Sequence, residues 1–158
     1  MKSYLFLVAC IWLALVSTEG AAFVFSDGTT AECVARGRAV IEIDGAPGSN
    51  VVQLGYTGIA EPTGSGYQIQ WNPGKLGQLP PALHDLIFFH ECAHAQIPTT
   101  DELRANCAGL KAMRAAGRAG FAVETKLAAA YGPGNEYWTR TLKCADADTA
   151  APPPKAAP

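Results

Sequence analysis

Residues 86–95 read Leu86-Ile87-Phe88-Phe89-His90-Glu91-Cys92-Ala93-His94-Ala95. Apolar side chains lie on almost every side of this stretch when it is drawn as a helix, which is typical of a buried helix. Proline at residue 81 favours a helix start there, because the first residue of a helix needs no N–H donor. The stretch therefore predicts a central buried helix from about Pro81 to Ala95, around which the rest of the domain packs.

Within this helix, His90-Glu91-Cys92-Ala93-His94 has the form H-E-x-x-H. His90 and His94 are four residues apart, so both imidazoles lie on one face and can direct nitrogens at a common point. Zinc accepts such nitrogens at about 2.0–2.1 Å, in a tetrahedral site that needs a third protein ligand and leaves one place for water. Glu91 lies one residue round the helix, which places its carboxylate beside a metal-activated water. The alternative is a buried histidine pair with a solvated glutamate, but each ring would then need partners for two nitrogens.

The third ligand is expected from the segment that follows. No histidine occurs beyond His94, and the next acidic residues are Asp101 and Glu102. A short connection over residues 97–99 returns the next helix alongside the first, so Glu102 can ligate the metal. Asn106 lies four residues later on the same face, where it can accept an N–H from a ligand histidine.

Glu102 also has another interpretation. Thr99-Thr100-Asp101-Glu102 has the form of a capping box, with Glu102 at the third helical position. We favour the ligand role, because a helix-borne histidine pair still needs a carboxylate. Asp101 is the second choice for that ligand.

The two segments together carry a resemblance. His90-Glu91-Cys92-Ala93-His94 followed by Glu102-Leu103-Arg104-Ala105-Asn106 looks like the zincin metallopeptidases of the glutamate-ligand type, and most like small secreted bacterial members with a short gap between the motifs. The resemblance covers about residues 80–116. It implies that Zn²⁺ is bound by His90, His94 and Glu102, that Glu91 is the general base, and that Asn106 orients a histidine. Thermolysin-like enzymes have a longer gap, so their substrate cleft cannot be transferred, and Asn106 replaces their more usual aspartate.

The function that this resemblance implies is hydrolysis of peptide bonds. A metal-activated water attacks the carbonyl carbon, and Glu91 takes its proton and delivers it to the leaving amine. Tyr131, Tyr137 and Arg140 flank the glycine–proline break at residues 132–134 and are candidates to stabilise the oxyanion, with ordinary packing or solvation as their alternative. Two other classes remain open: a non-catalytic zinc-binding or interaction domain that keeps the zincin fold, and a disulfide-stapled secreted domain without metal.

The two ends of the chain are predicted to lie outside the domain. Met1 and Lys2 precede an apolar run over residues 4–16, with small residues near Gly20 that suit cleavage. We interpret residues 1–20 as a signal peptide, the alternative being a retained membrane anchor. The mature protein is then secreted or periplasmic, with no stable membrane insertion. Residues 145–158 are rich in alanine and proline and are expected to be a disordered tail.

Removal of the signal peptide leaves four cysteines, Cys33, Cys92, Cys107 and Cys144. An even number in an exported chain predicts two disulfides, with three possible connectivities. We favour Cys33–Cys144 with Cys92–Cys107, although Cys92 points away from the face that carries the two histidines. Buried free thiols are the alternative.

The remaining residues, 21–144, are predicted to form one α+β domain of zincin-like architecture. Hydrophobic residues make up 49% and charged residues 16%, which suits a packed core, and a net charge of -2 without a basic patch argues against a nucleic-acid partner. We expect a monomer that acts on a peptide or protein substrate. A small N-terminal sheet packs on the H-E-x-x-H helix, with strands over 38–43, 51–56 and 67–71 and further helices over 100–116, 121–131 and 136–143.

Overall fold

The computed structural model describes residues 22–147. The predicted signal peptide and residues 148–158 of the predicted tail lie outside the described residues. Within the described range, the last helix continues to Ala147, past Lys143, where we expected it to end. The prediction of a disordered tail is therefore wrong for residues 145–147, which are helical. None of the helices between residues 22 and 147 is long and apolar enough to cross a membrane.

The strands form three small sheets. Two of them are antiparallel pairs, made by β1 (Phe23–Val24) with β2 (Thr30–Ala31) and by β3 (Val34–Ala35) with β4 (Arg38–Ala39). The third has the order β5-β7-β6, in which β7 (Gly66–Trp71) is parallel to β5 (Ile41–Asp44) and antiparallel to β6 (Gly58–Thr63). Among the strands of the described chain, β6 pairs only with β7 and is therefore an edge strand.

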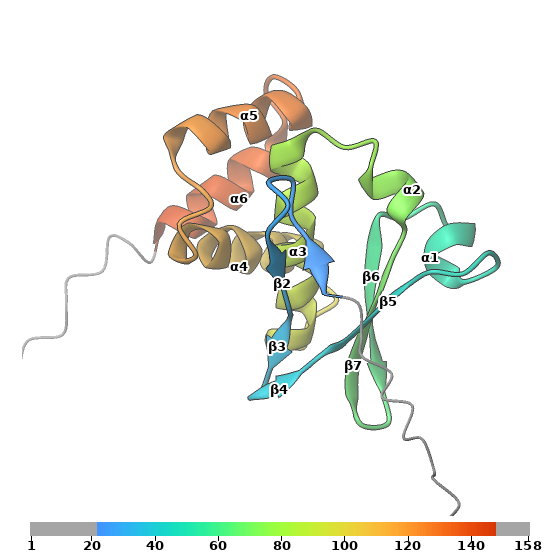
Figure 1. The fold of residues 1–158 in the computed structure, drawn as a ribbon. Coiled ribbons are helices and arrows are strands. Elements are labelled where there is room, and N and C mark those ends of the chain that lie inside the picture. The colour runs from blue at the N-terminus through green and yellow to red at the C-terminus, as the bar shows by residue number, and fades with distance from the viewer. Residues whose placement is uncertain (1–21, 148–158) are drawn as a thin grey trace, which may run out of the picture.

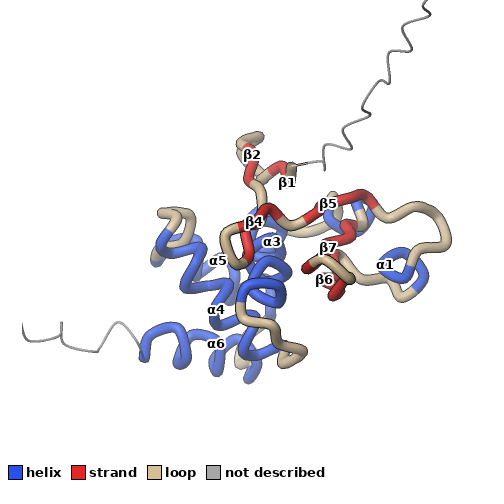
Figure 2. The backbone as a smooth tube through the Cα atoms, turned by 90° about the horizontal axis from the view of Figure 1, so that it is seen from below, coloured by secondary structure: helices blue, strands red, loops and turns tan. Residues whose placement is uncertain are grey.

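Helix α3 (Pro81–Gln96) stands at the centre of the molecule (Figure 1). It packs against the helices α4 and α5 and against the strands β3, β6 and β7. Seen from below, the four long helices gather on one side and the three-stranded sheet on the other (Figure 2). The other helices are α1 (Asn50–Gln53), α2 (Pro73–Leu76), α4 (Glu102–Ala115), α5 (Phe121–Tyr131) and α6 (Glu136–Ala147).

The core between α3 and the strands is rich in aromatic rings. Phe88 contacts both Phe23 and Phe25, with ring centroids 5.2 Å away in each case, and Phe89 stacks on Phe25. Trp71 at the end of β7 completes the cluster. These contacts bury the apolar face of α3, and burial of such large aromatic surfaces stabilises the fold.

The predicted α+β class is confirmed, and so is the buried central helix, which ends one residue later than expected. The strand predicted over residues 51–56 is wrong, because Asn50–Gln53 forms the short helix α1. A short apolar run does not by itself distinguish a strand from one turn of helix. Strand β6 was not predicted, although its backbone lies directly against the site described next.

Candidate metal centre

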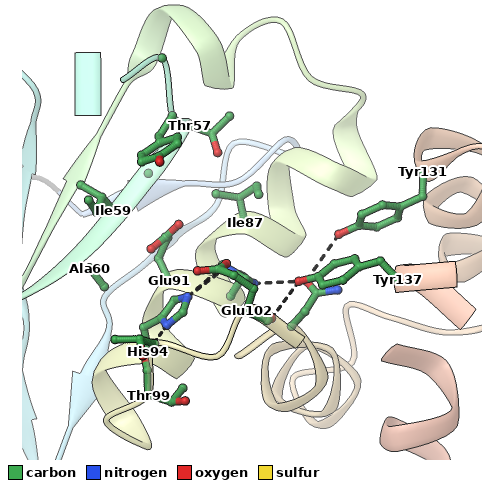
Figure 3. Close-up of a pocket in the computed structure, with 16 residues that line it drawn as sticks. Thr57, Ile59, Ala60, Ile87, Glu91, His94, Thr99, Glu102, Tyr131 and Tyr137 are labelled. Atoms are coloured by element: carbon green, nitrogen blue, oxygen red, sulfur yellow. Dashed lines mark hydrogen bonds and ion pairs between the residues drawn. The ribbon is translucent and has the colours of Figure 1, made fainter. Parts of the chain in front are cut away.

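Helices α3 and α4 bring together the three residues predicted as metal ligands. Figure 3 shows two of them, His94 and Glu102, in the pocket that they line. The Nε2 atoms of His90 and His94 lie 3.1 Å apart. Glu102, the first residue of α4, places Oε2 3.1 Å from Nε2 of His90 and 3.6 Å from Nε2 of His94. Both histidines are buried, whereas the Glu102 side chain is 68% exposed. This group could hold a metal ion.

The outer nitrogens of both histidines have hydrogen-bond partners. Nδ1 of His94 lies 2.7 Å from the carbonyl oxygen of Thr99, which can only accept, so Nδ1 carries the proton. Nδ1 of His90 lies 3.3 Å from Oδ1 of Asn106. The contact that we predicted between Asn106 and a ligand histidine is therefore present. If both imidazoles are neutral and carry their proton on Nδ1, the two Nε2 lone pairs face each other. They repel unless a cation or a proton lies between them.

The charges around the pair favour a cation there. The hydrogen bond with His90 lowers the pKa of Glu102, so this carboxylate stays ionised. Burial is the largest single influence on His90 and lowers its pKa, but the hydrogen bond with Glu102 and the charges of Glu91 and Glu102 outweigh it, and the net shift is upward. A positive charge, whether a proton or a metal ion, is thus stabilised at Nε2.

Glu91 lies beside this group without belonging to it. It is buried at the wall of the same pocket, between α3 and β6 (Figure 3). Burial raises the pKa of Glu91, and a hydrogen bond from the Ala60 backbone and the nearby histidines lower it only in part. Gly58 leaves room for this carboxylate, because a Cβ there would stand 2.9 Å from Cγ of Glu91 and 2.7 Å from Cζ3 of Trp71.

The pocket has a volume of about 700 Å³ and opens over the three candidate ligands. Tyr131 and Tyr137 line the pocket, where a residue that stabilises an oxyanion would have to lie. The third candidate, Arg140, is exposed and does not line it. Tyr137 donates its hydroxyl to the Glu102 carbonyl at 2.8 Å. Burial raises the pKa of both tyrosines, so both keep their protons and can donate hydrogen bonds.

The capping-box interpretation of residues 99–102 is wrong in its register. Asp101, not Thr99, is the N-cap residue of α4, and its Oδ1 accepts from the backbone N–H of Arg104 at 2.9 Å. Glu102 is therefore at the first helical position and its carboxylate is available to the histidines. Asp101, our second choice of ligand, serves the helix terminus instead.

The four cysteines form two disulfides, as predicted, but the favoured pairing is wrong. Cys33 pairs with Cys92, and Cys107 pairs with Cys144. The reason is the packing: β3 lies against α3 and brings Cys33 to the side of the helix away from the histidines, while α6 packs on α4. Cys92 and Cys107 sit on neighbouring helices but face different partners. The disulfides thus tie α3 to the segment that precedes β3 and α4 to α6.

Sequence reasoning missed Gly58 and Ala60 on β6 and Thr141 on α6, which touch Glu91 and Asn106 respectively. Glycine at residue 58 was a weak signal of a close approach between two segments, whereas nothing in the sequence pattern singles out Thr141.

Comparison of the chain with known protein families, curated proteins and solved structures finds no match. The function therefore has to be inferred from the site itself.

Proposed function

We propose that this protein is a zinc-dependent peptidase of the zincin type with glutamate as the third ligand. The observation that carries the proposal is the convergence of three donor atoms, two imidazole nitrogens and one carboxylate oxygen, at separations of 3.1 to 3.6 Å. The hydrogen bonds at Nδ1 of His90 and His94 favour a proton on Nδ1, which leaves the Nε2 lone pairs available to a metal ion.

The donor set suits zinc. Two ligands about 2.0–2.1 Å from a tetrahedral ion are separated by about 3.3 Å, close to the spacing of these atoms. Imidazole nitrogen with a single carboxylate favours zinc over calcium or magnesium, which prefer sites built wholly of oxygen. His90, His94 and Glu102 would hold the ion, and the pocket leaves its remaining side accessible.

Zinc, when bound, would polarise a carbonyl group and lower the pKa of water. Glu91 would take a proton from the attacking water and return it to the leaving amine, and its burial, which raises the pKa of the carboxyl group, suits that exchange. Tyr131 and Tyr137 remain the candidates to stabilise the oxyanion, and either would do so by turning its hydroxyl away from its present acceptor, Oδ1 of Asn106 for Tyr131 and the Glu102 carbonyl for Tyr137.

The edge of β6 supports a peptide as substrate. The register of β6 with β7 turns the N–H and C=O groups of Gly58 and Ala60 away from β7, toward the side on which Ala60 donates to Glu91. Both residues line the pocket. An extended peptide could pair with this edge and bring one of its carbonyl groups to Glu91 and the histidines.

The proposal includes export. Two disulfides are typical of proteins that fold in an oxidising compartment, and the apolar N-terminal segment agrees with a signal peptide. We therefore place the enzyme outside the cytoplasm, either in the periplasm or in the extracellular space, as a monomer.

The experiment is a measurement of zinc stoichiometry together with cleavage of a random peptide library. We expect one zinc per chain and hydrolysis that a chelator abolishes and added zinc restores. The His90→Ala variant should lose both, while Glu136→Gln, which changes an exposed carboxylate on α6, should lose neither. A protein that holds one zinc but cleaves no peptide would instead be a zinc-binding domain, and one that holds no zinc would contradict the proposal altogether.

A further inference from the structure

Helix α6 places a hydroxyl group against the side chain that orients His90. Oγ1 of Thr141 lies 2.9 Å from Nδ2 of Asn106, and both residues are almost fully enclosed, at 0% and 2% exposure. The two residues are 35 positions apart in the chain. Water cannot replace a missing partner at so buried a position. The choice of donor and acceptor in each hydrogen bond therefore decides whether a polar atom is left unsatisfied.

The direction of the Thr141 hydrogen bonds follows from its other neighbour. Oγ1 also lies 3.0 Å from the carbonyl oxygen of Tyr137, one turn earlier in α6. A carbonyl can only accept, so the single hydroxyl proton of Thr141 is donated there, as is usual for threonine within a helix. The hydroxyl therefore offers only a lone pair to Asn106, and the group of Asn106 that faces it must be the amide NH₂.

The Asn106 amide is thereby held in one of its two possible orientations. With NH₂ toward Thr141, Oδ1 faces Nδ1 of His90 at 3.3 Å and also accepts from the Tyr131 hydroxyl at 3.5 Å. While no metal is bound, Oε2 of Glu102, 3.1 Å from Nε2, competes for the His90 proton. An oxygen of Asn106 at this position favours that proton on Nδ1. Nε2 of His90 then presents a lone pair toward His94 and Glu102.

We infer that Thr141 is a positioning residue of the metal site: by fixing the orientation of the Asn106 amide, it favours the His90 tautomer whose Nε2 can bind a metal ion. The inference rests on the metal site of the proposed function and is independent of peptidase activity. The Cys107–Cys144 disulfide joins the same two helices next to this contact and keeps Thr141 within reach of Asn106.

Loss of the hydroxyl makes the other orientation accessible. In Thr141→Val, which keeps the shape of the side chain, the Asn106 amide has no acceptor on α6, so it can turn its NH₂ toward His90. Nδ1 of His90 would then accept, and its proton would move to Nε2, where Glu102 accepts it at the observed 3.1 Å. A ring protonated at Nε2 offers no lone pair to a metal there.

The experiment reads the tautomer directly. Protein labelled with ¹⁵N in histidine is freed of metal with a chelator, and the ¹⁵N shifts of the His90 ring are recorded at a pH at which both imidazoles are neutral. Glu102 and His94 both lie 3.1 Å from Nε2 and compete for the proton in the metal-free protein, so the variants are compared with one another. The fraction of the proton on Nδ1 should be largest in the parent and in Thr141→Ser, which keeps the hydroxyl. Thr141→Val should shift a large fraction of the proton to Nε2, and Thr141→Ala, which removes the same hydroxyl, should do so if the valine variant does not fold.

Zinc affinity gives a second readout. Thr141→Val should bind zinc on the order of 10-fold more weakly than the parent, the usual effect of losing a group that orients a ligand, and Thr141→Ser should stay within about threefold. In an Asn106→Asp background, both oxygens of the carboxylate can accept from His90, so Thr141→Val should no longer change the tautomer.

The outcomes separate the two proposals. If the fraction of the His90 proton on Nδ1 is the same in Thr141→Val and in Thr141→Ala as in the parent, the role of Thr141 is refuted even when the parent binds zinc. If the tautomer changes in these variants while the parent binds no zinc, Thr141 does orient His90 through Asn106, and it is the zinc proposal that fails.

Discussion

Gly109 of α4 lies against the main chain of Phe89 in α3: a Cβ on Gly109 would stand 2.9 Å from the Phe89 carbonyl carbon and 2.9 Å from the backbone nitrogen of His90. The atoms in the way are backbone, so no rotation of a side chain could relieve the contact. The absence of a side chain at this position therefore lets the two helices approach closely enough for Glu102 and Asn106 to reach His90.

Gly109→Ala should push α4 away from α3. We expect a net loss of about 1–2 kcal/mol in the free energy of unfolding, because the steric cost exceeds the better helix propensity of alanine. Zinc affinity should fall by at least about tenfold, since the ligand and the orienting amide move together. Urea denaturation and zinc titration measure the two effects.

The control for this variant is Gly74→Ala. A Cβ on Gly74, in α2, would meet its nearest atom at an ordinary 3.6 Å, so neither stability nor zinc affinity should fall. If Gly109→Ala behaves like this control, the close contact of the two helices is not what holds the site together.

Asp101 and Glu102 are adjacent carboxylates with separate roles, and two substitutions should separate them. Asp101→Ala removes the N-cap of α4 and should cost about 1 kcal/mol of stability with little change in zinc affinity. Glu102→Ala should strongly weaken zinc binding and leave the stability of the metal-free protein nearly unchanged. Zinc titration and urea denaturation of both variants give the comparison, and an exchange of the two results would mean that Asp101 is the ligand.

Glu91→Gln tests the proton transfer. The amide keeps the shape of the side chain but cannot take up and return a proton, so turnover should fall by at least about 10²-fold. Zinc affinity should change little, because Glu91 lies outside the group of three donors. Peptide hydrolysis and zinc titration are measured beside Glu136→Gln. Equal rates in Glu91→Gln and the parent would show that Glu91 is not the base.

Glu42 should make the stability of the metal-free protein depend on pH. Its carboxylate is buried, where it accepts hydrogen bonds from the Cys33 backbone at 2.7 Å and the Trp71 indole at 3.0 Å. Burial raises the pKa of Glu42 above its ordinary value of 4.5, despite these two bonds. Between the unfolded and folded pKa values the folded state holds more protons, so its stability decreases as the pH rises through that window.

The test compares the parent with Glu42→Gln, both free of metal, by urea denaturation from about pH 4 to pH 8. The stability of the parent relative to the variant should be greatest at the acid end, decline as the pH rises through the folded pKa of Glu42, and then stay constant. A difference that does not vary with pH would mean that the pKa of Glu42 is not raised.

The features that the sequence predicts best are those set by residues close together in the chain, such as helix boundaries and the residues that share one helix face. The apolar run around His90 and the proline at residue 81 placed α3 to within one residue, and the glycine–proline break after Tyr131 placed the end of α5 correctly. The spacing of the two histidines and of Glu102 also identified three side chains that do meet in space, because helix geometry fixes which residues share a face.

What was missed depends on contacts between distant segments. Strand β6 contains Pro62, which usually argues against a strand, but in the observed register the ring replaces an N–H that would point away from β7. The disulfide pairing followed the packing of β3 and α6, which no periodicity reports. The sequence around Thr141 gives no sign of a special role, because its contact with Asn106 depends on the packing of α6 against α4.

The disulfides join consecutive cysteines of the described chain, Cys33 with Cys92 and Cys107 with Cys144, so their loops do not overlap. If the chain is exported amino terminus first, Cys33 and Cys92 leave the translocation channel before Cys107 does. An oxidase that links thiols as they emerge would then form the observed pairs directly. Maturation should therefore need no disulfide isomerase, and the second bond, which secures α6 and Thr141 beside Asn106, would be the last to close.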